Sequence, residues 1–171
     1  MKRAVALGLL AAGFVVGCGK TDAPAASSAP PAIVGAWRSS VQFQSGAFAP
    51  VKDLEFLYSF NLGGTMTESS NYDAAPPVPP AYGIWRQIGP REYEARYDFY
   101  STKAPAALGE ITKGGGWLPA GRGMLVEKIT LSEDGRSFTS TIKYTALDRA
   151  GAPAEGGGEA VGKGTRMGFE D

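Results

Sequence analysis

Apolar and polar residues alternate along short segments of the chain from Ile33 onward. Alternation with a period of two predicts β-strands that have one dry face and one solvated face. The clearest example is 92–100, where Tyr93, Ala95, Tyr97 and Phe99 alternate with charged residues. The pattern predicts strands at 33–43, 54–62, 65–72, 82–88, 92–100, 124–131, 137–147 and 159–169. No segment has a sustained 3.6-residue apolar stripe, so no major helix is expected.

Glycine, proline, aspartate and serine separate these segments. The pair Asp134-Gly135 predicts a hairpin with a type I′ turn, in which both central residues have positive φ. The long segment 101–123 is rich in Gly, Pro and Ala and is predicted to be irregular, with one short helical turn near 104–108. Loops of this length in compact domains are often functional, which makes this segment a candidate lid.

Consecutive strands joined in order by hairpins predict an all-β fold, an antiparallel up-and-down barrel of about eight strands. Closure into a barrel removes exposed sheet edges; a β-sandwich is the alternative. The predicted inward side chains either fill the barrel or line a small cavity in it. The candidate ligand-lining residues are Phe56, Tyr58, Phe60, Tyr97, Phe99, Glu127, Phe138, Ile142 and Tyr144.

The first residues have the features of a secretory signal. Lys2 and Arg3 precede an apolar run over 4–16, and small residues then lead to Cys18, the single cysteine. The run is shorter than the ~20 residues that a membrane-spanning helix needs. We therefore predict a signal peptide over 1–17; an exported soluble protein with an incidental cysteine is the alternative.

The sequence Val15-Val16-Gly17-Cys18 resembles the bacterial lipobox. This resemblance implies cleavage before Cys18 and attachment of lipid to its thiol, and two or three acyl chains hold a protein at a membrane effectively for good. Gly19 follows, where inner-membrane lipoproteins often have Asp, so a periplasm-facing location at the outer membrane of a bacterium is expected. Residues 18–32, rich in Ala, Pro and Ser, form a predicted flexible tether to a domain over 33–171.

Composition excludes several kinds of site. The chain has no histidine, so Ser-His-Asp, Cys-His and ordinary zinc or copper centres are excluded, and no metal or cofactor is expected. Lys and Arg total 17 and Asp and Glu total 17, a balance that argues against nucleic acid as a partner. The segment 157–163 matches the spacing of a phosphate-binding loop up to Lys163, but Gly164 stands where Ser or Thr would ligate magnesium.

Glu127 is the candidate acid or ligand-binding residue. It shares a strand face with Leu125, Ile129 and Leu131, so its carboxyl is predicted to point inward, with a raised pKa, as an acid or a ligand-binding group. Alternatively it lies near an open rim, or pairs with an arginine, Arg38 or Arg86. Glu55, Glu68 and Asp98 also alternate with apolar neighbours and are predicted to lie on the solvated outer face.

The segment Gly35-Ala36-Trp37-Arg38 and the late Arg166 resemble a motif of the calycin superfamily, the lipocalins and their relatives. The resemblance implies that Gly35 and Trp37 lie at the closed end of the barrel and that Arg166 packs across the indole, a cation–π contact. Together with a second Gly-x-Trp-Arg at 83–86, these features resemble a family of small secreted bacterial proteins related to lipocalins.

Three functions follow as hypotheses. The first is a non-catalytic, lipid-anchored lipoprotein that binds a small apolar or amphipathic ligand inside the barrel, through the end carrying 73–80 and 101–123. The second is a protein-interaction or inhibitor module with a filled barrel, an apolar patch near Trp117 and Leu118, and an envelope protein as partner. The third is a barrel-type cyclase or isomerase that uses Glu127 with a tyrosine. An interior volume on the order of several hundred Å³ favours carriage of a ligand, whereas close packing favours surface recognition.

Overall fold

The structure, a computed structural model, describes residues 30–72, 78–113 and 116–170. The predicted signal peptide, Cys18 and most of the tether lie outside the described residues. The strands are β1 Gly35–Phe43, β2 Leu54–Phe60, β3 Thr65–Ser70, β4 Ala81–Gln87, β5 Glu92–Lys103, β6 Leu118–Leu131, β7 Ser137–Leu147 and β8 Gly158–Arg166.

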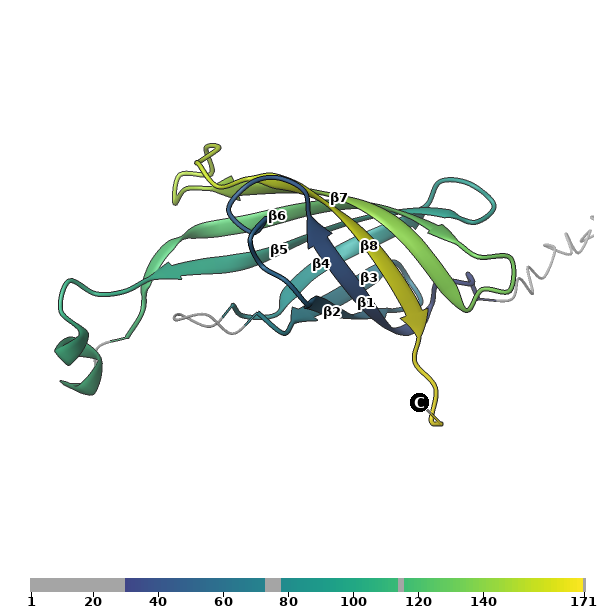
Figure 1. Cartoon of the computed structure of the whole chain (residues 1–171), viewed down its shortest axis with the longest axis horizontal. Coiled ribbons are helices and arrows are strands. Elements are labelled where there is room, and N and C mark those ends of the chain that lie inside the picture. Colours follow the sequence, from purple (N-terminus) through teal and green to yellow (C-terminus); the bar gives the residue numbers. More distant parts are fainter. Residues whose placement is uncertain (1–29, 73–77, 114–115, 171) are drawn as a thin grey trace, which may run out of the picture.

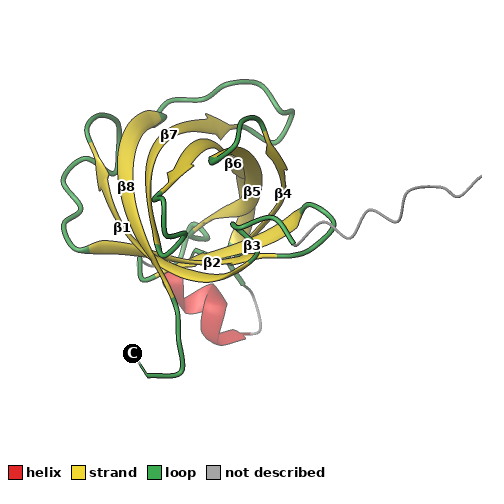
Figure 2. Ribbon diagram, turned by 90° about the vertical axis from the view of Figure 1, so that its right-hand side faces the viewer, coloured by secondary structure: helices red, strands yellow, loops and turns green. Residues whose placement is uncertain are grey.

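The eight strands form one closed antiparallel barrel in which each strand pairs with its neighbours in the chain (Figures 1 and 2). The ring closes because β1 pairs with β8 as well as with β2, so that Val41 lies opposite both Leu54 and Gly162. The predicted up-and-down barrel is confirmed, and the alternative of a sandwich is wrong.

The largest difference from the predicted elements is in 101–123. β5 and β6 stay paired as far as Lys103 and Leu118, with a register shift at Ser101/Thr102, and a 3-10 helix spans Leu108–Lys113. The result is a hairpin arm that extends beyond the barrel (Figure 1). Backbone pairing across the hairpin extends strands through Gly and Pro, which local propensity disfavours.

Inward side chains of the strands make a continuous core. The inner face of β8 is small, with Ala160, Gly162 and Gly164 at the buried positions. A Cβ atom at Gly164 would lie 2.2 Å from the ring of Phe138. Gly158 and Gly162, in the segment that matches a phosphate-binding loop, therefore belong to a strand, and Gly162, like Gly164, makes room for a side chain from a neighbouring strand.

Trp37 seals one end of the barrel. Its side chain is fully buried, and its indole Nε1 donates a hydrogen bond to the carbonyl oxygen of Ile33 at 2.8 Å. The guanidinium carbon of Arg166 lies 4.2 Å from the centroid of the indole, which confirms the predicted contact. A cation–π contact of this kind contributes about 0.5–2 kcal/mol.

Arg166 also links three segments of the chain at this closed end. Its Nη1 donates to the carbonyl oxygen of Val34 at 2.8 Å, its Nε donates to that of Gly135 at 3.1 Å, and its Nη2 donates to that of Ala32. Gly35 has φ of 136°, and a Cβ atom there would lie 2.6 Å from Nη1 of Arg166. The glycine of the Gly-x-Trp motif thus makes room for the arginine.

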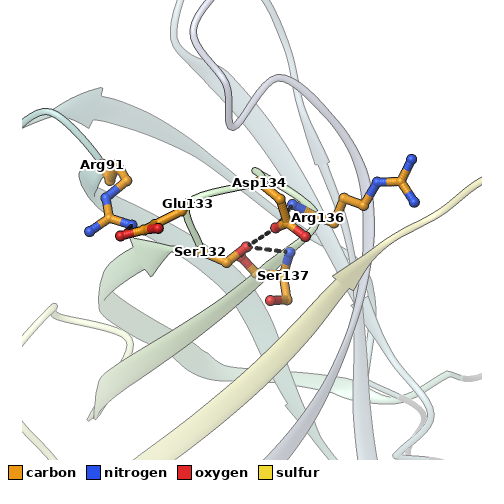
Figure 3. Close-up of polar contacts among 6 residues, drawn as sticks. All are labelled: Arg91, Ser132, Glu133, Asp134, Arg136 and Ser137. Atoms are coloured by element: carbon orange, nitrogen blue, oxygen red, sulfur yellow. Dashed lines mark hydrogen bonds and ion pairs between the residues drawn. The ribbon is translucent and has the colours of Figure 1, made fainter.

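The turn beneath Arg166 joins β6 to β7 (Figure 3). The Gly135 N–H donates to the Ser132 carbonyl oxygen at 3.1 Å, and the Asp134 carboxylate accepts from Ser132 Oγ at 2.6 Å and from the Arg136 N–H at 3.0 Å. These bonds lower the pKa of Asp134. Gly135 has φ of 66°, whereas Asp134 is not among the residues with positive φ, so the predicted type I′ turn is wrong. The loop ends in a left-handed glycine, as longer hairpin loops commonly do.

We expect Arg166→Met to lower the free energy of unfolding by about 2–4 kcal/mol, because three carbonyl groups lose a charged donor and the indole loses its cation. Chemical denaturation with tryptophan fluorescence measures the change. Arg38→Met is the matched control, because Arg38 is exposed on the outer face of β1, and it should change stability by less than about 0.5 kcal/mol. Equal effects of the two substitutions would contradict this role of Arg166.

Candidate functional site

A cluster of polar groups lies in the middle of the barrel interior. Glu127 is fully buried on β6. Its Oε2 accepts hydrogen bonds from the hydroxyl of Tyr97 on β5 at 2.8 Å and from the hydroxyl of Tyr58 on β2 at 3.0 Å. The prediction that this carboxyl points inward is confirmed, and neither Arg38 nor Arg86 pairs with it: Arg38 is exposed, and Arg86 is paired with Glu94 at the surface.

Burial determines the protonation of this cluster. Desolvation raises the pKa of Glu127, while the hydrogen bonds from the hydroxyls of Tyr97 and Tyr58 oppose that rise. Burial, followed by the charge of Glu127, raises the pKa values of both tyrosines well above their usual range. Each group therefore favours its neutral form.

The other oxygen of Glu127 faces small residues of the barrel wall. Oε1 has no hydrogen-bond partner among the described residues, and Ser140 Oγ likewise has none. A Cβ atom at Gly162 would lie 2.4 Å from Ser140 Oγ, 3.3 Å from Ser39 Oγ and 3.8 Å from Glu127 Oε1. These buried polar atoms gather around one glycine of β8.

A cavity lies at the end of the barrel opposite Trp37. Its volume of about 30 Å³ is enough for one or two waters, so side chains fill most of the interior. It is lined by Phe43, Phe48, Leu54, Phe56, Glu68, Ser70, Tyr72, Val78, Phe99, Leu125 and Tyr144.

Glu68 is the acidic group in the wall of this cavity. It is only 6% exposed, and its Oε1 has no hydrogen-bond partner among the described residues. The prediction that Glu68 lies on the solvated outer face is wrong, because it shares the inner face of β3 with Met66, two positions away. Desolvation, followed by the charge of Glu127, raises the pKa of Glu68 from 4.5 to about 8. The other two carboxyls of that prediction are not buried as Glu68 is. Glu55 is exposed, and Asp98 is half-buried and forms an ion pair with Arg122 at 2.7 Å.

Phe48, in the loop between β1 and β2, closes the cavity together with other aromatic rings. Its ring centroid lies 5.3 Å from those of Phe43, Tyr72 and Tyr144. The loop touches the β7–β8 connection, where the Ala47 N–H donates to the Gly156 carbonyl oxygen at 3.4 Å. This loop is therefore part of the cover of the cavity, and the connection between β3 and β4 borders the cavity as well, through Tyr72 and Val78. The described residues of the candidate lid 101–123 contribute none of the lining residues.

The nine predicted ligand-lining residues fall into three groups. Phe56, Phe99 and Tyr144 border the cavity. Tyr58, Tyr97 and Glu127 form the polar cluster, and Ile142 lies opposite Glu127 in the ladder. Phe60 and Phe138 pack near the closed end, with ring centroids 6.3 Å from Trp85 and 5.3 Å from Trp37 respectively.

Sequence reasoning missed most of the other lining residues. Phe43 and Leu54 follow the alternation of β1 and β2, and Glu68 follows that of β3, so a stricter count of period-two positions would have found them. Tyr72 continues the alternation of Glu68 and Ser70 just past the end of β3, so the same count would have found it. Phe48 and Val78 lie in loops, where no periodicity shows which side chains turn inward.

The described residues place only a few kinds of polar group in the barrel interior. They contain no group of three or more metal-ligating side chains. They also contain no helix that is long and apolar enough to cross a membrane. What they place together is an aromatic cavity, one carboxyl in its wall and a second carboxyl, held by two tyrosines, deeper in the barrel.

Fold and site together define a closed eight-stranded barrel with one end sealed by Trp37 and the other covered by Phe48. Comparison of the chain with models of known protein families and with curated proteins found no match.

We expect Glu68→Gln to remove the pH dependence that this carboxyl gives to stability. Because the folded-state pKa is about 8, its contribution is fully present below pH 4.5 and is lost as the pH rises to about 8. The amide keeps the neutral shape at every pH. The free energy of unfolding of the variant, relative to that of the wild type, should therefore be a few kcal/mol higher at pH 9 than at pH 5. Urea unfolding at both values measures this difference.

Glu55→Gln is the control for this experiment, because Glu55 is exposed on the neighbouring strand. Its stability relative to the wild type should not change between the two pH values. A Glu68→Gln variant that tracks the wild type at both pH values would show that this carboxyl ionises normally in the folded protein.

Proposed function

We propose that this protein is a non-catalytic binding protein that takes up a small amphipathic ligand in the half of the barrel beneath Phe48. The observation that carries the proposal is the cavity itself: an apolar, mostly aromatic wall with a single buried carboxyl in it. Ligand sites in proteins have this composition, in which apolar walls supply affinity and a few polar groups fix orientation.

The small volume of the cavity requires that the ligand displaces its cover. Phe48 belongs to a loop and is only partly buried, whereas Phe56 and Leu125 belong to paired strands. Moving one loop enlarges the cavity without breaking the barrel ladder. Local opening of loops costs far less than global unfolding.

The polar cluster supports a non-catalytic role. Glu127 has no exposed surface, and the oxygen that bonds the tyrosines is held from two sides. A substrate would have to pass the cavity and the side chains between to reach it. The cluster is better suited to ordering the barrel interior than to transferring protons.

We further propose that the protein is a lipoprotein anchored through Cys18 in the bacterial outer membrane and facing the periplasm. The described chain begins beside the closed end, where Ala32 accepts a hydrogen bond from Arg166. The cavity lies at the other end of the barrel. A tether that joins the barrel at its closed end leaves the covered end free to exchange ligand.

A protein-interaction module is the second candidate, and two observations favour it. The interior is mostly filled, with a cavity of about 30 Å³. Several apolar side chains are exposed on the outer face of β2 and β4 and just after β8: Leu57, Tyr82, Ile84 and Met167. Of the predicted patch on the arm, Leu118 is 45% exposed and Trp117 is partly buried.

We expect a neutral naphthylamine dye to bind the wild-type protein with a rise in fluorescence. Ser70→Trp should weaken this binding at least about tenfold, because Ser70 borders the cavity and an indole there fills it. Ser69→Trp is the matched control, because Ser69 is exposed on the opposite face of β3. Absence of dye binding, or equal loss in both variants, would favour the protein-interaction module, for which cross-linking in the cell envelope is the direct assay.

We expect Cys18→Ala to abolish incorporation of a labelled fatty acid into the protein. The substitution removes the only thiol that acyl chains can modify. Metabolic labelling with a fatty acid measures the change, and Ser28→Ala in the tether is the control. A Cys18→Ala variant that still incorporates the fatty acid would contradict the anchor.

A further inference from the structure

We propose that the ligand of this cavity is a basic amine with an apolar chain, and that Glu68 is the residue that binds its ammonium group. This inference rests on the proposed function, since it names the chemical class of ligand for the same site.

The first support is the unpartnered carboxyl. Glu68 is buried in the cavity wall, and its Oε1 has no hydrogen-bond partner among the described residues. A buried polar group with an unmade hydrogen bond destabilises the protein, and a buried charged group does so more strongly. A donor that enters the cavity removes this cost, and an ammonium group supplies both donors and the opposite charge.

The second support is the absence of any cation among the described residues of the wall. None of the described residues that line the cavity is a lysine or an arginine. A fatty acid or other anionic ligand would leave its carboxylate unpaired beside Glu68, and burial of an unpaired charge is strongly unfavourable. An ammonium group meets a carboxylate at hydrogen-bonding distance, and the charge pair forms stronger hydrogen bonds than neutral groups do.

The third support is the aromatic wall. The rings of Phe43, Phe48, Tyr72 and Tyr144 surround the cavity, with neighbouring centroids 5.3 to 6.2 Å apart. Aromatic faces attract cations within about 6 Å of the ring centroid. The same wall buries an alkyl or aryl chain, so one cavity satisfies both ends of an amphipathic amine.

Binding of the amine releases a proton below pH 8. The titratable groups that face Glu68 from the elements packed around it are Glu127 on β6, Tyr58 on β2 and Tyr97 on β5, and burial favours the neutral form of each. Tyr72 and Tyr144 border the cavity as well. Glu68 must lose its proton to solvent to pair with the ammonium group, so affinity for the amine should rise with pH as far as about 8.

Competition among three ligands of equal chain length tests the head group. Octylamine, octanol and octanoate are titrated at pH 7.5 against the neutral dye on the wild-type protein, on Glu68→Gln and on the exposed control Glu55→Gln. On the wild type and the control, octylamine should displace the dye at a concentration at least tenfold below that of octanoate. On Glu68→Gln, octylamine should no longer displace the dye at a lower concentration than octanol does. The concentration of octanol that displaces the dye should stay within about twofold of its value on the wild type.

The outcomes separate this inference from the proposed function. If the dye does not bind, both are overturned. If the dye binds and octanoate equals or exceeds octylamine, or Glu68→Gln weakens all three ligands alike, binding stands and the amine is overturned.

A second measurement needs no variant. The affinity of the wild type for octylamine should rise by up to about tenfold per pH unit between pH 6 and pH 8, with release of a proton seen by calorimetry in two buffers. The affinity for octanol should stay constant. An octylamine affinity that does not change over this range would overturn the role of Glu68.

Discussion

Closure of β1 onto β8 is the constraint on which the rest of the structure depends. A sheet of eight strands left open would expose two edges and leave its inner face in water. Arg166 fixes the closure where it matters most, because its side chain covers the indole of Trp37 and donates hydrogen bonds to three carbonyl groups of the two segments that meet β8 there. The inward side chains at this end are buried because the end is sealed.

Burial inside the barrel raises the pKa of any acid placed there. Glu127 and Glu68 lie on different strands, yet burial raises the pKa of both, and the charge of Glu127 raises the pKa of Glu68 further. Two tyrosine hydroxyls satisfy one oxygen of Glu127. Nothing among the described residues does the same for Oε1 of Glu68. That difference separates an acid that orders the core from one that is available to a ligand.

Most of the fold could be predicted from the sequence, and less of the candidate site. Alternation in 92–100 and 137–147 is strict because each strand has one face in the core, and the closing contact of Trp37 with Arg166 followed from a motif resemblance. The turn type at Asp134 was predicted wrongly because hydrogen bonds of its side chain shape the turn. The hairpin arm was not predicted because pairing between β5 and β6 extends both strands through Gly and Pro.

The site was harder to predict because loops complete it. Glu127 was found because three apolar residues share its face, but Glu68 has only Met66 beside it and two serines after it, a weak signal for burial. Phe48 turns inward from a loop, and no local pattern in the sequence specifies that. Geometry was needed to bring an unpartnered acid and an aromatic cover together.

The central claim is that the barrel holds Glu68 neutral at pH 7 in the absence of ligand. Carbon-13 NMR of the side-chain carboxyl groups, titrated from pH 3 to pH 10 and assigned with Glu68→Gln, measures this directly. The account predicts that the Glu68 resonance titrates with a midpoint near pH 8 and that octylamine moves this midpoint downward. A midpoint near 4.5, the usual value for a solvated glutamate, would contradict it.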